Sequence, residues 1–354
     1  MSCFTHVRAV VGGATALLSV GACQTQPASP QGSLTELSSV LIDSPYPKTT
    51  SLIIYRGDTL VHEGYYNQGT PELLNNTRSA TKTVVALAVG AAIANGDLDS
   101  ALDLAMAPLA RERGVVLSPL KAAITYRDLL TMSSALHCND DGRSPGTEDN
   151  MHATEVWENF VLGLPDQPGY ARDEKGLGSF RYCTAGTFWL GQALEHETGQ
   201  PIDEYVAEHI FAPLGIENAE WFRSPSGEVQ TGGGLELSSR DLSKLIRLVR
   251  DGGVYQGQQI VPEAWANDMA TPWRDAGRGM RYGYQMWNRD YDYGCGTSTA
   301  WLMAGNGGSH MLAIKEHDLA IVLTRQNYNT NGMHQESNAL MEKVVLPSLL
   351  CPAG

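Results

Sequence analysis

The sequence predicts an α/β fold of the α+β type. A mainly antiparallel sheet built from both ends of the chain is flanked by helices and carries an inserted, mostly helical domain. Strand-like apolar runs occur at about residues 45–70 and again at about 280–350. Helix start and stop signals dominate the stretch between them, at about 100–270. One sheet assembled from both chain ends is the simplest arrangement of these segments.

Composition excludes several classes of protein. The 354 residues are 42% hydrophobic and 18% charged, which is globular rather than disordered and allows two domains or one interleaved domain. The formal net charge of −14 opposes binding to nucleic acid. Beyond the N-terminal segment, no stretch reaches the ~20 apolar residues that span a bilayer.

The N-terminal segment has the features of an export signal. Residues 1–22 contain Arg8, no acid and a short apolar run, and the small residues Gly21 and Ala22 precede Cys23. This ending resembles a bacterial lipobox, in which the cysteine is lipidated after cleavage; an ordinary signal peptide with an incidental cysteine is the alternative. We expect residues 1–22 to be a lipoprotein signal peptide and residues 23–34 a lipid-anchored polar tether.

Cleavage would leave an anchored protein in the bacterial cell envelope, facing the periplasm. Loss of one arginine takes the net charge to −15, so the body would be held off anionic headgroups and touch the membrane through its anchor alone. Gln24 is neither acidic nor basic and favours the outer membrane over the inner one.

The elements of the main domain, residues 35–350, follow in order. Segments 51–55 and 59–62 flank a glycine-containing turn and predict a β-hairpin. An Ala-, Val- and Leu-rich helix is predicted over 79–95, because Gly96 supplies its end. Capping patterns and apolar spacing predict further helices starting at 125 and spanning 186–197, 201–212 and about 238–252. Late strands are predicted at 281–287, 300–304, 311–314 and 319–324, a surface loop at 290–293, and a last helix at about 333–349.

The expected compartment indicates a role for each of the six cysteines. Cys3 lies in the signal and Cys23 is the candidate lipid site, so four remain in an exported chain, where disulfides persist. Four cysteines allow three pairings, which the sequence does not decide. Pairing of Cys138 with Cys183 and of Cys295 with Cys351 is favoured, because the first would flank the candidate site and the second would fix the C-terminus.

One short sequence pattern indicates candidate catalytic residues. The chain has no G-x-S-x-G, no H-E-x-x-H and no P-loop, but it contains Ser79-Ala80-Thr81-Lys82. Residues three apart share a helix face, so the lysine amine can reach the serine hydroxyl. A desolvated lysine loses its proton more easily and can act as a base. The same spacing recurs at Ser118 and Lys121, where a proline indicates a loop without a catalytic role.

Two later segments complete a set of three motifs. Tyr182-Cys183-Thr184 precedes a predicted helix, and Asn306-Gly307-Gly308-Ser309 lies between two predicted strands. With Arg78-Ser79-Ala80-Thr81-Lys82 they resemble the three motifs of the serine β-lactamase and penicillin-binding-protein superfamily. More narrowly, the chain is similar to its class C-like branch, nearest to family VIII esterases and 6-aminohexanoate-dimer hydrolases. Thr231-Gly232-Gly233-Gly234-Leu235 also resembles that branch, and the likeness covers about residues 35–350.

The resemblance implies a role for each matching residue. Ser79 would be the acyl-accepting nucleophile, and Lys82 and Tyr182 would share proton handling. The backbone N–H groups of Ser79 and Ser309 would form the oxyanion hole. The expected substrate-binding residues are Thr184, Asn306, Gly307, Gly308, His310 and Trp301, the last as a pocket wall. No metal or cofactor is expected.

Two departures from the family pattern bear on the substrate. Thr184 stands where the family has an asparagine and lacks the amide donor, and Asn306 stands where it has a lysine that pairs with a substrate carboxylate. His310 is expected to replace that cation in part below about pH 6.5. These changes argue against an efficient β-lactamase or D-Ala transpeptidase. They favour an esterase or amidase for less anionic substrates.

Two functions stay open at this point. The first is a lipid-anchored serine hydrolase that cleaves a small-molecule ester or amide through an acyl-enzyme. The second is a catalytically weak lipoprotein, D-Ala peptidase-like, that binds peptidoglycan or a β-lactam; the two lost side chains favour it. The intact set Ser79, Lys82 and Tyr182 favours the enzyme. Residues 137–141 indicate a polar rim loop rather than a metal cluster, and the oligomeric state is left open.

Overall fold

The structure is a computed structural model that describes residues 41, 46 and 48–352. The expected signal peptide, Cys23 and the whole of the expected tether lie outside the described residues. Within the described part, no helix is both long and apolar enough to cross a membrane.

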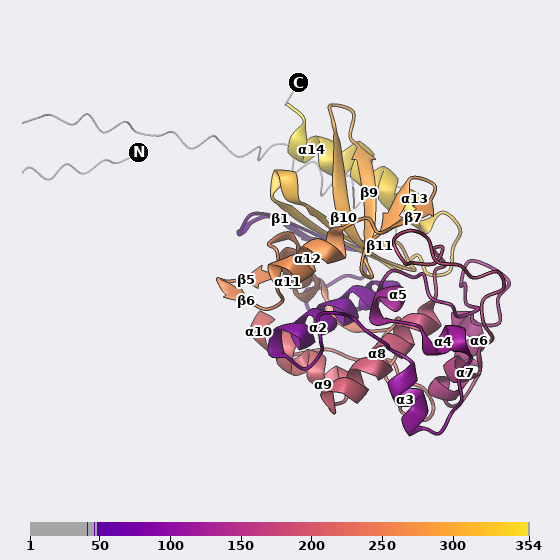
Figure 1. The fold of residues 1–354 in the computed structure, drawn as a ribbon. Helices are drawn as coiled ribbons and strands as arrows, with labels where there is room; N and C mark the ends of the chain where they lie inside the picture. The colour runs from indigo at the N-terminus through magenta and orange to yellow at the C-terminus, as the bar shows by residue number, and fades with distance from the viewer. Residues whose placement is uncertain (1–40, 42–45, 47, 353–354) are drawn as a thin grey trace, which may run out of the picture.

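An eight-stranded antiparallel sheet joins the two ends of the chain, as predicted (Figure 1). The hairpin of β1 (Thr49–Arg56) and β2 (Thr59–Tyr65) forms one edge, and β1 pairs with β12 (Leu319–Arg325). The strand order is β2-β1-β12-β11-β10-β9-β8-β7. The other strands of this sheet are β7 (Arg274–Gly277), β8 (Met280–Tyr282), β9 (Trp287–Asp292), β10 (Thr297–Gly305) and β11 (Ser309–Ile314).

Side chains alternate between the two faces of this sheet. On β11, Met311 and Ala313 join the larger of two hydrophobic clusters, whereas Leu312 and Ile314 join the smaller one. The same alternation along β10 and β11 decides which functional side chains can reach the candidate site.

The C-terminal helices cover the face that carries the smaller cluster. They are α13 (Met333–Leu340), the π-helical turn η4 (Met341–Val345) and α14 (Leu346–Leu350), shown in yellow beside the sheet in Figure 1. Together they form the helical stretch predicted at about 333–349.

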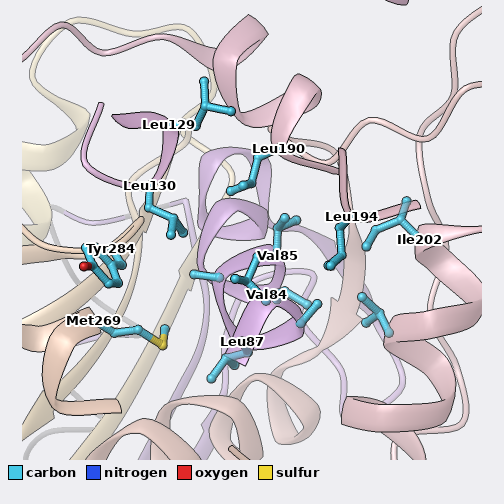
Figure 2. Close-up of a cluster of buried hydrophobic side chains, with 14 of the residues drawn as sticks. Val84, Val85, Leu87, Leu129, Leu130, Leu190, Leu194, Ile202, Met269 and Tyr284 are labelled. Atoms are coloured by element: carbon cyan, nitrogen blue, oxygen red, sulfur yellow. The ribbon is translucent and has the colours of Figure 1, made fainter. Parts of the chain in front are cut away.

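The opposite face packs on α11 and the helical part of the chain. Helix α11 (Ser239–Arg250) lies against β1, β11 and β12. Helix α2 (Thr81–Asn95) runs through the larger cluster, and it is apolar on every side because neighbours surround it. Figure 2 shows Val84, Val85 and Leu87 of α2 enclosed by Leu129, Leu130, Leu190, Leu194, Ile202, Met269 and Tyr284.

The region between the two parts of the sheet consists mainly of short helices. The capping box predicted at Thr125 is present and opens α5. The helices of this region are α3 (Ala107–Glu112), α4 (Pro119–Ala122), α5 (Tyr126–Leu130), α6 (Glu148–His152), α7 (Trp157–Gly163), α8 (Thr184–Thr198), α9 (Ile202–Val206), the π-helical turn η2 (Ala207–Phe211), α10 (Ala212–Leu214) and α12 (Glu263–Ala270). Two small sheets pair β3 (Leu74–Asn76) with β4 (Glu236–Ser238) and β5 (Val254–Tyr255) with β6 (Gln258–Gln259).

Three local expectations were wrong. The strand predicted at 281–287 is two strands, because Tyr284 and Met286 turn into the larger cluster between β8 and β9. The loop predicted at 290–293 is mostly the end of β9, where Tyr291 is buried between two outward-facing aspartates. Residues 119–122 form the short helix α4 rather than a loop, because Ser118 accepts a hydrogen bond from Lys121 N at 3.1 Å and caps its start.

Candidate active site

Ser79 lies on a tight 3₁₀ turn, η1 (Arg78–Ala80), directly before α2. Threonines on both sides fix this turn. Thr81 Oγ1 donates to the Arg78 carbonyl at 2.7 Å, and Thr77 Oγ1 donates to the Leu235 carbonyl at 2.7 Å. Arg78 has a positive φ of 49°, a backbone conformation that costs energy in a non-glycine residue and concentrates at functional sites. The turn leaves Ser79 partly exposed at the start of a buried helix.

Lys82 is buried, with 1% of its surface exposed, and its amine reaches three oxygen acceptors. Nζ donates to Ser79 Oγ at 3.2 Å, to Thr184 Oγ1 at 2.9 Å and to the Gly232 carbonyl. Burial lowers the pKa of Lys82, while the carboxylates of Glu148 and Asp140 act in the opposite direction. The amine is therefore placed and biased to accept a proton from the serine hydroxyl.

Tyr182 is the second polar side chain that reaches Ser79. Its phenol is hydrogen-bonded to the Ser79 side chain, and burial raises the pKa of Tyr182 far above its usual range. The ring stacks on Trp287 with centroids 5.5 Å apart, and the Lys82 amine lies 5.0 Å from the Tyr182 centroid. Because the phenol keeps its proton, Tyr182 is suited to pass a proton to a leaving group, and Lys82 is the better base.

A disulfide and one carboxylate hold the segment that carries Tyr182. Cys138 and Cys183 are bonded, and the Asp140 N–H donates to the Tyr182 carbonyl at 2.8 Å. The Asp140 carboxylate accepts from Thr184 N and from Glu148 N, each at 2.7 Å. The loop expected at the rim therefore lies against the motif. Both favoured disulfides are present, the second joining Cys295 and Cys351.

The turn between β10 and β11 packs against η1. A β-carbon on Gly305 would lie 2.1 Å from the Thr77 carbonyl oxygen, so only glycine allows this contact. Gly307 and Gly308 have φ values of 103° and 85°. Their N–H groups donate to Met333 Sδ and to the Gly305 carbonyl, both at 3.1 Å. The Ser309 N–H stays the predicted oxyanion donor, whereas Ser309 Oγ is held by the backbone of β12.

Asn306 and Thr184 are both engaged within the protein. The Asn306 amide donates to Asn329 Oδ1 and accepts from Asn329 N, each at 2.8 Å. The Thr184 hydroxyl accepts from Lys82 at 2.9 Å. Asn306 carries no positive charge and Thr184 has no amide donor, so the two side chains differ in chemistry from the family's lysine and asparagine.

The structure does not bring His310 or Trp301 to the Ser79 cluster. His310 lies on the opposite face of the sheet, 1% exposed, with Nε2 3.0 Å from Nδ1 of His334. Burial lowers the pKa of His310 well below its usual value. The expectation that His310 replaces the family's lysine charge is therefore wrong. Trp301 precedes Gly305 by four residues, about 13 Å along β10, and its ring lies 5.7 Å from the Lys315 amine.

Two charged residues at the site were missed by the sequence reasoning. Arg78 lies over the Tyr328 ring at 4.9 Å, and Glu148, in the first turn of α6, is the carboxylate that acts most strongly to raise the pKa of Lys82. Arg78 could have been found as the neighbour of Ser79. Glu148 had no such signal, because only the disulfide-bonded loop brings it near.

The second serine–lysine pair is structural. Lys121 Nζ donates to the carbonyls of Leu162 and Leu164 at 2.6 and 2.8 Å, and Ser118 Oγ donates to Asp166 at 2.5 Å. The described residues contain no group of three or more side chains suited to hold a metal ion.

Sequence comparison identifies relatives of this chain. The profile of the family described as Beta-lactamase matches residues 48–346. The 6-aminohexanoate-dimer hydrolase of Paenarthrobacter ureafaciens is 26% identical over 228 residues, which cover 62% of this chain and 57% of that protein. The putative penicillin-binding protein PbpX of Bacillus subtilis (strain 168) is 22% identical over 182 residues, covering 49% and 41%. The chain thus matches only about half the length of these curated relatives.

Solved structures share the fold. A penicillin-binding protein homologue from Caulobacter crescentus superposes with a TM-score of 0.66 at 16% identity, covering 91% of this chain and 98% of that one. D-amino acid amidase from Ochrobactrum anthropi SV3, complexed with D-phenylalanine, gives a TM-score of 0.64 at 17% identity, covering 90% and 99%. The family profile spans most of the sequence, and these structures share its architecture, so the chain belongs to the beta-lactamase family.

Proposed function

We propose that this protein is a serine hydrolase that cleaves an ester or amide through an acyl-enzyme at Ser79, with weak or no β-lactamase activity. The observation that carries the proposal is the hydrogen-bonded set at the start of α2. Lys82 Nζ lies 3.2 Å from Ser79 Oγ, and the Tyr182 phenol bonds to the same side chain. A nucleophile flanked by a buried amine and a protonated phenol is arranged for acyl transfer.

The proposed first half of the reaction forms the acyl-enzyme. The neutral Lys82 amine takes the hydroxyl proton while Ser79 Oγ bonds to the substrate carbonyl carbon. The N–H groups of Ser79 and Ser309 donate to the oxygen that becomes negative. Tyr182 gives its proton to the leaving oxygen or nitrogen as that bond breaks, and the proton held by Lys82 restores the phenol.

The second half returns the enzyme to its starting state. Water attacks the acyl carbon and gives up a proton to the same amine and phenol pair. The bond to Ser79 Oγ then breaks, and Oγ regains a proton as the acid leaves. No residue beyond the set above is needed for the proton balance.

The proposed substrate preference rests on the chemistry of two side chains. Asn306, which is hydrogen-bonded to Asn329, has no positive charge to pair with a β-lactam carboxylate, and Thr184, which accepts from Lys82, has no amide N–H to donate to an acyl amide. This supports an ester or amide substrate of lower negative charge.

The proposed location rests on the sequence alone. We propose export, lipidation at Cys23 and a periplasm-facing anchor, with the outer membrane as its site. Cys23→Ala should release the protein from the membrane fraction. Retention of that variant on membranes would overturn the lipid anchor.

The test of the proposed reaction is hydrolysis of p-nitrophenyl butyrate by the purified mature protein. We expect Ser79→Ala to abolish turnover, and Lys82→Ala and Tyr182→Phe each to lower kcat about 100-fold or more. The matched control is Ser118→Ala, in the second serine–lysine pair, which should keep kcat. Turnover that survives in Ser79→Ala would refute the assignment. An inactive wild type would favour the weak binding protein instead.

A further inference from the structure

We propose that a cavity beside α12 is a binding site for a free α-amino acid with an apolar side chain. The cavity has a volume of about 310 Å³, and Ile93 of α2 is one of the residues that line it. Ile93 follows Lys82 by eleven residues, which is about 16 Å along α2. The cavity is therefore separate from the Ser79 site and does not depend on the proposed hydrolysis there.

Three aromatic rings form the apolar walls of this cavity. Trp273 stacks on Tyr284, which is labelled in Figure 2, with ring centroids 5.7 Å apart. Trp265 tilts against the same tyrosine at 5.2 Å. The Trp265 Nε1–H donates to the Ala86 carbonyl at 2.9 Å, and the Trp273 Nε1–H donates to the backbone carbonyl of Asp268 at 3.0 Å. Because both indole N–H groups are already bonded, the indoles offer a ligand apolar contact.

Arg127 brings a positive charge to the cavity. Its guanidinium carbon lies 4.3 Å from the centroid of the Trp273 ring, and its Nε is buried without a hydrogen-bond partner. Its polar neighbour Tyr284 is uncharged at neutral pH, because burial raises the pKa of that phenol to about 12. No carboxylate of the described residues forms an ion pair with Arg127. A ligand carboxylate could accept hydrogen bonds from this guanidinium, since the two groups match in shape and charge.

Asp268 brings a negative charge to the same cavity. Within the described part of the chain, no group donates a hydrogen bond to its carboxylate or forms an ion pair with it. Burial raises the pKa of Asp268, and the positive charge of Arg127 acts in the opposite direction. The two side chains are thus close enough to interact electrostatically, yet they do not pair directly. The cavity holds a cation and an anion that are both available to a ligand.

This combination of charges favours a zwitterion. A ligand with one charge would pair with Arg127 or with Asp268 and leave the other group unpaired, whereas an α-amino acid carries a carboxylate for the first and an ammonium for the second. Sites for small molecules start at about 300 Å³, so a cavity of about 310 Å³ suits a single amino acid rather than a peptide. The aromatic walls favour an apolar side chain on that amino acid.

Isothermal titration calorimetry with three probes of similar shape tests both charges. The probes are L-leucine, 3-methylbutylamine, which lacks the carboxylate, and 4-methylpentanoate, which lacks the ammonium. At about pH 7, roughly three units above the usual pKa of an aspartate, we expect L-leucine to bind the purified protein with a Kd of about 1 mM or below. Each probe with a single charge should bind at least about tenfold more weakly.

Two variants assign the charges to their partners. Asp268→Asn should weaken L-leucine at least about tenfold without weakening 4-methylpentanoate, and Arg127→Gln should weaken L-leucine without weakening 3-methylbutylamine. The matched control is Glu263→Gln, which removes an exposed carboxylate from the first turn of α12 and should leave the Kd of L-leucine unchanged. Circular dichroism checks that each variant is folded, and Asp268→Asn decides the matter if Arg127→Gln does not fold.

Four results would overturn the site. They are the absence of L-leucine binding to the wild type, equal affinity for L-leucine and a probe with one charge, an unchanged Kd in Asp268→Asn, and an equal loss in Glu263→Gln. None of these results bears on turnover at Ser79, so the proposed hydrolase would stand or fall separately.

Discussion

The two disulfides form a matched pair for testing what positions Tyr182. One joins Cys138 to Cys183, next to Tyr182, and the other joins Cys295 to Cys351 near the C-terminus. The first is removed by combining Cys138→Ala with Cys183→Ser. Serine at 183 keeps an acceptor for the Gly186 N–H that now reaches Cys183 Sγ at 3.1 Å, so the start of α8 stays capped. The control combines Cys295→Ala with Cys351→Ser.

The expected loss of stability is nearly equal for the two pairs. The bonds close loops with sequence separations of 45 and 56 residues. Loop-closure entropy then gives about 4 kcal/mol for each at 25 °C. With unfolding entropy of about 2.1 cal/mol/K per residue over roughly 300 residues, either loss lowers Tm by about 6 °C.

The kcat values should distinguish the two disulfide variants. We expect the Cys138/Cys183 variant to lose about tenfold or more in kcat on p-nitrophenyl butyrate at 20 °C, because the loop that bonds the Tyr182 carbonyl is released. The Cys295/Cys351 variant should keep kcat. Thermal unfolding by circular dichroism and initial rates measure the two effects. Equal activity in both variants, with Tm lowered in both, would refute the positioning role.

Three further predictions concern single residues. The kcat/KM of the wild type should rise with pH as Lys82 loses its proton, with a midpoint below the usual range of a lysine pKa. Glu148→Gln should move that midpoint lower, because it removes a negative charge that favours protonated Lys82. A midpoint that does not move in the pH–rate profile of this variant would contradict the coupling. Thr184→Val should lower kcat about tenfold while Tm stays within ~2 °C of the wild-type value, because the Lys82 amine loses a hydrogen-bond acceptor at 2.9 Å. An unchanged kcat in initial-rate assays would show that Thr184 does not position the amine. Gly90→Ala should cost about 1–3 kcal/mol in chemical denaturation without changing kcat, since its β-carbon would meet Trp265 Cδ1 at 2.2 Å; wild-type stability would mean that α2 shifts freely.

Much of the fold was predictable because its signals are local. The hairpin at β1 and β2, the caps of α5 and α11 and the glycine after α2 all depend on residues close together in the sequence. The strands β8 and β9 were merged because the inward turn between them is produced by packing against distant residues. Tyr291 was assigned to a loop because aspartates flank it, although alternation of buried and exposed residues is also the pattern of a strand.

The residues of the candidate site also divide into those that local sequence predicts and those that distant contacts place. Ser79 and Lys82 share a helix face, so their proximity follows from spacing, and Tyr182 follows from a motif. His310 was misplaced because sequence does not state which face of β11 looks toward Ser79. Glu148 was missed because Asp140 and a disulfide, rather than sequence neighbours, set its position.

The pairing of β1 with β12 also determines the order in which the molecule can be completed. Leu52 pairs with Leu323, so a chain that emerges N-terminus first cannot close its sheet until β12 has been made. Ser79 on η1, the proposed nucleophile, meets the β10–β11 turn only at that late stage. Loss of the last strand by truncation would expose the edges of β1 and β11 to pairing with other chains. The proposed catalytic arrangement therefore cannot form before β12 has been made, and a copy that lacks this strand is expected to aggregate rather than to act as a partial enzyme.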